Sequence, residues 1–167
     1  MRKTDEKEKR FIELTDCYKD LIARVCCSYA SASASFDDLY QEVLINIWQG
    51  MDSFRGDAKI STWLYRTAIN TCITWHRKNY RHSESNISRI DDLKIEPADP
   101  SAENSAADDV QFLRNLISQL EPVDRAIITM WLDECPYEEI SAVTGLSQTN
   151  VGVRLHRIKQ RLAKMTD

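Results

Sequence analysis

Residues 136–165 read PYEEISAVTGLSQTNVGVRLHRIKQRLAKM, and this stretch decides the fold of the C-terminal part of the chain. Pro136 suits the first turn of a short helix, and two glutamates follow near the positive end of its dipole. Gly145 can form a tight turn because glycine adopts positive φ without steric cost. Ser147 then caps a second helix, whose apolar residues recur at helical spacing: Val151, Leu155, Ile158 and Leu162. The stretch predicts a helix-turn-helix.

The second helix of this motif is basic, with no acidic residue before Asp167. A helix-turn-helix presents the early residues of its second helix to base edges in the major groove. Cations further along release condensed counterions when they meet phosphates. The predicted DNA contacts are Ser147, Gln148, Asn150, Gly152, Val153, Arg154, His156, Arg157, Lys159, Arg161 and Lys164. A merely solvated basic helix is the alternative, so the motif alone predicts DNA binding and nothing finer.

Upstream of the motif, the apolar pattern predicts helices at about residues 110–120 and 123–132, which makes residues 110–167 a four-helix domain. Residues 83–109 are rich in Ser, Asp, Glu and Pro and have no sustained apolar period. Such a composition cannot offset the entropy of ordering by burial. We predict a flexible acidic linker there.

The N-terminal residues contain three apolar stripes at helical spacing, at about residues 8–29, 35–51 and 61–80. Ser35 and Asp38 form a capping-box pattern before the second stripe, and Gly56 interrupts the chain before the third. The sequence therefore predicts an all-α protein with two small helical domains. These are an N-terminal three-to-four-helix bundle (residues 1–82) and the C-terminal domain (residues 110–167), joined by the linker.

The net charge of −4 is concentrated in one part of the chain. Residues 1–82 contain 13 basic and 11 acidic residues, residues 83–112 contain 2 and 8, and residues 113–167 contain 7 of each. The excess negative charge belongs to the linker region. The overall acidity of the protein is therefore no argument against nucleic-acid binding by either end.

Several classes of function find no support in the sequence. The five cysteines include no CxxC pair and, with the three histidines, no metal-ligand spacing, so we interpret them as reduced, apolar core residues. No phosphate loop, catalytic motif or cofactor site is recognisable. The start of the chain has no apolar run typical of a signal peptide, and no apolar run could span a bilayer. We therefore predict a cytoplasmic protein that is not an enzyme and binds no cofactor, metal or small-molecule substrate.

Residues 54–70 read FRGDAKISTWLYRTAIN and open the third stripe. An adhesive RGD requires secretion, which the sequence does not support. The helix beyond the Gly turn interleaves aromatic and basic side chains, the combination that holds single-stranded nucleic acid by stacking and charge. Burial in the core is the alternative for the tryptophans; Trp75 continues the apolar stripe, whereas Trp63 fits either interpretation.

The second stripe has a polar outer face: Asp37, Asp38, Gln41, Glu42, Asn46 and Gln49. A solvated face and a partner-binding face are both compatible with it.

The N-terminal helical bundle, the acidic linker and the helix-turn-helix domain, in this order, resemble an extracytoplasmic-function sigma factor. This is the small two-domain class of RNA polymerase specificity subunit. FRG followed by TWLYR and Asn70 is similar to the family's second region, and YEEI with the GLS turn is similar to its fourth. The resemblance implies an N-terminal domain for core binding and −10 recognition, and a C-terminal domain for −35 recognition.

The resemblance also implies roles for individual residues. Contacts with the clamp helices of the largest polymerase subunit are expected from Asp38, Gln41, Glu42, Ile45 and Trp48. Capture of a flipped −10 base and binding of the melted strand are expected from Phe54, Arg55, Gly56, Asp57, Ile60, Trp63, Tyr65, Arg66, Asn70, Arg77 and Arg81. The basic helix-turn-helix residues would read the −35 element as a duplex.

The chain departs from the family pattern at three of these positions. Gly152 stands where relatives often have a basic or polar residue, His156 stands at an important base-reading position, and Ile60 replaces a common aromatic. The implied partners are the two largest core polymerase subunits, promoter DNA and an anti-sigma factor, without membrane insertion. An autonomous helix-turn-helix regulator and an interaction module that binds no DNA are the alternatives.

Overall fold

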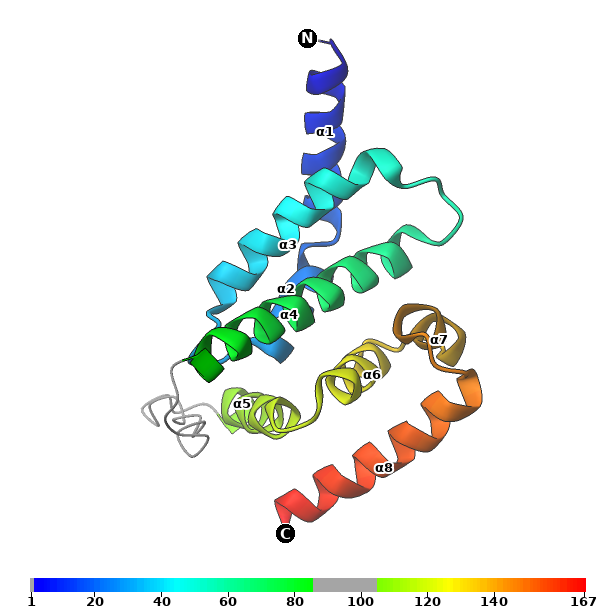
Figure 1. Cartoon of the computed structure of the whole chain (residues 1–167). Helices are drawn as coiled ribbons and strands as arrows, with labels where there is room; N and C mark the ends of the chain where they lie inside the picture. The colour runs from blue at the N-terminus through cyan, green and yellow to red at the C-terminus, as the bar shows by residue number, and fades with distance from the viewer. Residues whose placement is uncertain (1, 86–104) are drawn as a thin grey trace.

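The computed structural model describes residues 2–85 and 105–167, and their regular structure is entirely helical (Figure 1). The elements are α1 (Arg2–Cys17), α2 (Lys19–Tyr29), α3 (Phe36–Gly50), a 3-10 turn (Met51–Ser53), α4 (Ile60–Ser85), α5 (Ser105–Ser118), α6 (Pro122–Leu132), α7 (Tyr137–Thr144) and α8 (Gln148–Thr166). The all-α prediction is confirmed. Helices α4 and α5 extend into the range predicted as linker, and its residues 86–104 lie outside the described residues.

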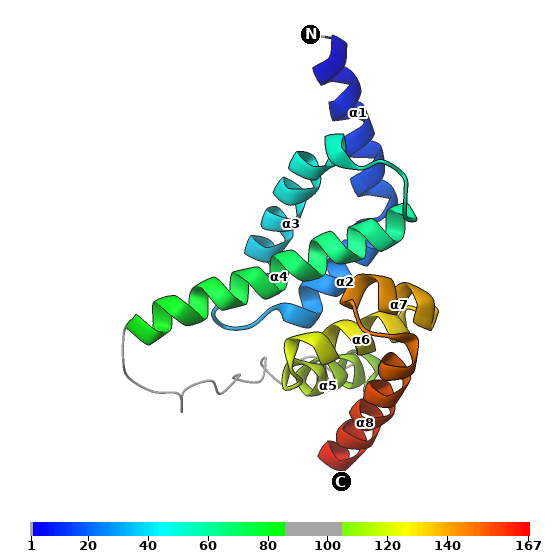
Figure 2. The same ribbon diagram turned by 45° about the vertical axis from the view of Figure 1, so that its right-hand side comes forward.

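The first helix is divided, where the sequence predicted one helix over residues 8–29. The division falls at Tyr18, whose φ of −110° departs from helical geometry. Helix α1 buries no residue and projects from the body of the protein (Figures 1 and 2). Helix α2 buries Leu21, Ile22, Val25, Cys26 and Tyr29. Because of this bend, the α1 part of the apolar stripe packs against α3. The α2 part of the stripe enters the central core.

The N-terminal bundle is formed by α2, α3 and α4, which all pack on one another. Ser35 caps α3, because its hydroxyl accepts a hydrogen bond from the amide of Asp38 at 3.1 Å. Gly50 at the end of α3 allows close approach of Trp63 on α4, since a Cβ there would lie 3.0 Å from the indole. Trp75 also packs against the core, as its place in the apolar stripe predicted.

The C-terminal half packs α8 against α5, α6 and α7. Pro122 occupies the first turn of α6, as predicted. Between α7 and α8, Gly145 has a φ of 77°, and the Ser147 hydroxyl accepts from the Asn150 amide at 3.1 Å. These two local features produce the predicted helix-turn-helix.

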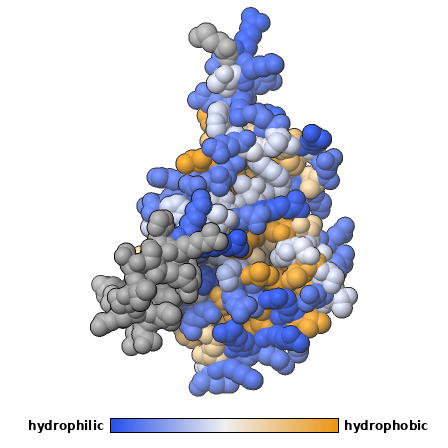
Figure 3. All heavy atoms as spheres, in the orientation of Figure 1, coloured by the Kyte–Doolittle hydropathy of each residue, from blue (hydrophilic) through white to orange (hydrophobic). Residues whose placement is uncertain are grey.

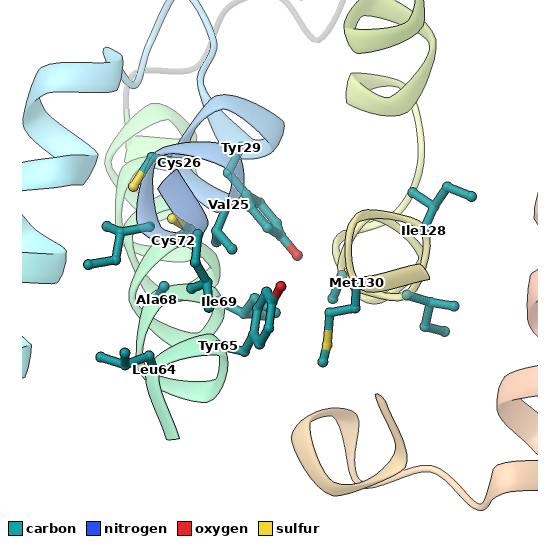
Figure 4. Packing of buried hydrophobic residues seen from close by; sticks show 14 of the residues in the cluster. Val25, Cys26, Tyr29, Leu64, Tyr65, Ala68, Ile69, Cys72, Ile128 and Met130 are labelled. Atoms are coloured by element: carbon teal, nitrogen blue, oxygen red, sulfur yellow. The ribbon is translucent and has the colours of Figure 1, made fainter. Parts of the chain in front are cut away.

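The two halves share one hydrophobic core rather than standing apart on a tether. Helix α2 packs on α5 and α6, and α4 packs on α7 (Figure 2). Tyr29 and Tyr65 extend from α2 and α4 towards α6, and Met130 of α6 faces them (Figure 4). This contact could not be predicted from the sequence, because helical periodicity does not say which helix an apolar face will meet.

The surface is hydrophilic over α1 and more apolar over the C-terminal helices (Figure 3). Exposed hydrophobic residues there include Leu132, Tyr137 and Val153. In the described part of the chain, no helix is long and apolar enough to cross a membrane.

The five cysteines are all free thiols. Cys26 and Cys72 are buried, and Cys27 and Cys135 are half-buried, as expected of core residues. Cys17 is exposed at the end of α1, so its prediction as a core residue was wrong. The reason is that the chain bends at Tyr18, so that α1, which ends at Cys17, buries none of its residues.

Candidate nucleic-acid interface

The predicted polymerase-binding residues follow one outer face of α3. Asp38, Gln41 and Ile45 are exposed, and Glu42 is half-buried beside them. Spacings of three and four place these four side chains together. Ile45 is an apolar side chain with 48% exposure in a polar row, which suits a contact surface better than a purely solvated one.

Trp48 lies at the edge of this face and is covered by α1. Its ring meets Phe11 edge-on at 5.3 Å, and the Lys7 ammonium lies 4.5 Å from its centroid. Asn46 is also less available than its sequence suggested, because its amide donates to the Thr71 hydroxyl of α4 at 2.8 Å. Both residues hold α3 against neighbouring helices.

The loop before α4 has the turn that its glycine predicted. Gly56 has a φ of 79°, and Arg55 and Asp57 on either side of it are exposed. Phe54 folds back onto Trp63, with ring centroids 5.3 Å apart. Trp63 is thus partly core and partly surface, which is why periodicity alone left both interpretations open.

A cavity of about 390 Å³ opens beside this loop. Its lining joins the loop and the start of α4 to the far end of α1: Arg10, Glu13, Leu14, Cys17, Tyr18, Met51, Phe54, Ile60 and Trp63. The contribution of residues 10–18 could not be predicted from the sequence, because no motif relates them to residues 54–63.

The predicted strand-binding residues of α4 beyond its first turn are not all exposed. Arg66, Asn70 and Arg77 are exposed on one face of the helix. Arg81 belongs to the last turns of α4, where side chains lie outside the described residues. Tyr65 does not join this face: it continues the buried stripe and is only 4% exposed. One residue of helix turns a side chain through about 100°, so neighbours in sequence face different partners.

The C-terminal half covers Tyr65 and engages the residues around it. The Tyr65 hydroxyl donates to Asp133 Oδ2 at 2.6 Å, and Arg66 Nη2 donates to the Ala142 carbonyl at 2.6 Å. Burial, and then the hydrogen bond to Asp133, raise the pKa of the Tyr65 phenol, so it remains a neutral donor. Part of the predicted strand surface is therefore occupied from within the chain.

Helix α8 presents most of its predicted base-reading side chains to solvent. Ser147, Gln148, Asn150, Val153 and His156 are exposed. Arg157 and Arg161 are exposed further along the helix. This arrangement can place polar side chains in a groove and cations against the flanking backbone.

Three predicted DNA contacts of α8 have partners inside the C-terminal half. Gly152 faces α7, where a Cβ would lie 3.3 Å from Tyr137 Cε2. Arg154 forms an ion pair with Asp124 of α6 at 2.9 Å. The Lys159 ammonium lies 3.8 Å from the Trp131 ring centroid. The sequence could not separate these residues from free ones, because each partner lies on another helix.

The described residues contain no group of His, Cys, Asp or Glu that could hold a metal ion. The surfaces are those of an all-α DNA-binding protein, with a helix-turn-helix in its C-terminal half and an aromatic and basic helix in its N-terminal half.

Comparison with known families narrows this class. Residues 14–82 match the family model Sigma-70 region 2, and residues 113–162 match Sigma-70, region 4. The RNA polymerase sigma factor YlaC of Bacillus subtilis is 31% identical over 129 residues, covering 76% of this chain and 75% of its own. The ECF RNA polymerase sigma-E factor of Escherichia coli K12 is 29% identical over 169 residues, covering 93% and 85%.

Two solved structures share the fold. The sigma factor RpoE in complex with the anti-sigma factor NepR from Bartonella quintana has a TM-score of 0.74 at 22% identity, covering 95% of this chain and 97% of that one. CnrH in complex with the cytosolic domain of CnrY has a TM-score of 0.67 at 19% identity, covering 96% and 89%.

The chain belongs to the sigma-70 family and is an extracytoplasmic-function sigma factor. Its function is promoter-specific initiation of transcription with RNA polymerase.

Proposed function

We propose that this chain, acting in the cytoplasm as a non-enzymatic subunit, directs RNA polymerase to promoters through three separate surfaces. These are the outer face of α3 for core polymerase, the loop of residues 54–60 with the exposed face of α4 for the −10 element, and α8 for the −35 element. The observation that carries the proposal is that one chain combines the exposed basic face of α4, beside the Phe54–Trp63 aromatic pair, with a helix-turn-helix. A regulator that binds only duplex DNA needs no stacking surface.

The α3 face is proposed to bind the clamp helices of the largest polymerase subunit. Support comes from the exposed Asp38 and Gln41 beside the exposed apolar Ile45. Such a mixture can combine hydrogen bonds at the rim with apolar contact at the centre. Trp48 would act indirectly, by holding α1 beside this face.

The loop and α4 are proposed to hold the melted −10 strand. Gly56 keeps the loop open, and Phe54 with Trp63 offers aromatic surface at the cavity beside it. Asn70 and Arg77 continue along the exposed face of α4, where a strand could follow them.

Helix α8 is proposed to read the −35 element with its first two turns. Gln148, Asn150, Val153 and His156 are the base-edge candidates, and Arg157 and Arg161 are the phosphate candidates. We exclude Gly152, Arg154 and Lys159 from base reading because of their contacts inside the C-terminal half.

The partners of the related structures suggest one further component. The RpoE structure contains that sigma factor with the anti-sigma factor NepR, and the CnrH structure contains CnrH with the cytosolic domain of CnrY. We propose that an anti-sigma factor also regulates this chain.

Run-off transcription tests this function directly. Purified core polymerase is incubated with and without the chain on a fragment library from the source genome, and new transcripts are mapped. Start sites that require both components, sharing two spaced sequence elements, are expected. Tight duplex binding by the chain alone, with no such start sites, would instead identify an autonomous regulator.

A further inference from the structure

In most hydrogen bonds between the described parts of the two halves, the donor lies in the N-terminal half and the acceptor in the C-terminal half. On the N-terminal side, donors come from Arg24 of α2 and from Ser61, Thr62, Tyr65 and Arg66 of α4. On the C-terminal side, acceptors come from Asp133, Glu139 and the Ala142 carbonyl. A nucleic-acid backbone likewise offers these groups acceptors, in its phosphate oxygens.

Asp133 lies at the centre of this contact. Its Oδ1 pairs with Arg24 Nε at 2.6 Å, and its Oδ2 accepts from the Tyr65 hydroxyl at 2.6 Å. The Asp133 side chain is 9% exposed, whereas Arg24 is 51% exposed. One carboxylate therefore binds a guanidinium and a phenol together, as one phosphate group could.

Glu139 engages the start of α4 in the same manner. Its Oε1 accepts from the Ser61 hydroxyl at 3.1 Å and from the Thr62 hydroxyl at 3.0 Å. Thr62 is only 5% exposed, so its hydroxyl would lose a buried acceptor if α7 moved away. Separation of the halves thus leaves a row of unpartnered donors beside the exposed strand face of α4.

We propose that Arg24, Ser61, Thr62 and Tyr65 form a phosphate-binding extension of the α4 strand surface, and that Asp133 and Glu139 occupy this extension when the halves are closed. This donor patch is available to the non-template strand only after the C-terminal half has moved. Strand binding is thereby linked to the separation of the two halves. Asp133 and Glu139, which hold the halves together, compete with the phosphates of DNA for the same donors. The inference rests on the proposed function, because it requires that α4 binds a single strand.

The contact includes further polar links outside the donor patch, and two of them come from the end of α2. The Tyr29 hydroxyl donates to the Pro122 carbonyl at 2.6 Å, and Thr129 donates to the Ser28 hydroxyl at 2.9 Å. These links hold the halves together without involving a carboxylate. Neutralising Asp133 and Glu139 therefore tests competition for the donor patch without removing every contact.

The experiment uses the full chain without polymerase and a short fluorescein-labelled single strand of mixed sequence. The variant Asp133→Asn with Glu139→Gln keeps the shape of both side chains and removes their charges. Fluorescence anisotropy should show roughly tenfold tighter strand binding, since the apparent affinity rises with the fraction of open molecules. Small-angle X-ray scattering of the same variant should show a larger radius of gyration.

A matched control separates opening from a general change of charge. Glu134→Gln with Glu138→Gln removes two negative charges from exposed neighbours of the same residues. This control should bind the strand as the unmodified chain does. An equal gain in both double variants would overturn the proposal, because the gain would then follow net charge alone.

Arg24 supplies the second test. In the Asp133→Asn, Glu139→Gln background, Arg24→Ala should lower the salt dependence of strand binding by about one phosphate contact, whereas Lys19→Ala on the same helix should not. If the Asp133→Asn, Glu139→Gln variant has a larger radius of gyration but binds the strand no more tightly, the phosphate-binding role of the donor patch is refuted. If its radius of gyration does not increase, the role of the two carboxylates in holding the halves together is refuted. Run-off activity of the unmodified chain is measured separately, so either failure can occur while the sigma function stands.

Discussion

Gly145 illustrates how one residue determines the geometry of a binding motif. Its φ of 77° lies in the left-handed region, and an added Cβ would meet nothing within 4 Å. The cost of a side chain here is therefore conformational and not steric. We expect Gly145→Ala to lower the free energy of unfolding by about 1 kcal/mol, measured by urea denaturation.

Gly56 provides the comparison for this prediction. It also has a positive φ, 79°, and open space around its Cβ position. Gly56→Ala should have a similar cost, although it lies in the other half of the molecule. Unchanged stability in both variants would contradict the argument from backbone conformation.

Asn70 lies on the exposed face of α4 that we propose binds the melted strand, and it is not part of the hydrophobic core. Asn70→Ala should therefore impair promoter melting, measured by permanganate reactivity of thymines, while leaving holoenzyme assembly intact. Gln111→Ala, which removes an exposed amide side chain from α5 outside the three proposed surfaces, is the control. Equal loss of melting and of assembly in Asn70→Ala would refute its role in the strand surface.

At the scale of the element, α8 contains two kinds of arginine. Arg157 is exposed, so Arg157→Ala should weaken DNA binding about evenly across sequences and reduce the salt slope by about one. Arg154 instead pairs with Asp124, and its replacement by Ala should lower stability by up to about 1 kcal/mol. Filter binding at several salt concentrations and urea denaturation separate the two effects. A change of base preference in Arg157→Ala would make that residue a reader.

Helix α3 has a face whose residues make few contacts within the chain. Gln41→Ala combined with Glu42→Ala should weaken assembly with core polymerase without altering stability, because both side chains lie on the outer face. Size-exclusion chromatography of holoenzyme mixtures measures this. Asp16→Ala removes one exposed charge from α1 and controls for charge. Normal assembly of the double variant would refute the proposed α3 interface.

The helices themselves were largely predictable from local pattern. Capping at Ser35 and Ser147, the break at Gly145 and the apolar stripes are properties of neighbouring residues, and the structure confirms them. The bend at Tyr18 was not predictable, because the helical stripe continues through it. It depends on α1 following α3 while α2 enters the core.

At the scale of the whole molecule, one core spans both halves, so a single cooperative unfolding transition is expected. Tyr29 is 1% exposed and donates to the Pro122 carbonyl at 2.6 Å across the contact. Tyr29→Phe should reduce stability by about 1 kcal/mol, because it leaves that carbonyl without this donor. Thermal denaturation of the full chain measures the effect.

Tyr40 offers the control for this prediction. It is a half-buried tyrosine of α3, and its ring packs near Phe36 rather than against the C-terminal half. Tyr40→Phe should leave the transition nearly unchanged. Two separate transitions in the unmodified chain would contradict a shared core.

The sequence by itself determined the all-α fold and the helix-turn-helix, because both follow from short-range periodicity, capping and motif spacing. The resemblance to sigma factors added a prediction of which residues contact polymerase and DNA. Tertiary structure decided which of those residues are free. Tyr65 meets Asp133, Arg154 meets Asp124, and Gly152 meets Tyr137 only after distant helices have packed. Pairing between helices depends on the complementarity of whole faces in three dimensions, and no local pattern in this chain specifies that complementarity.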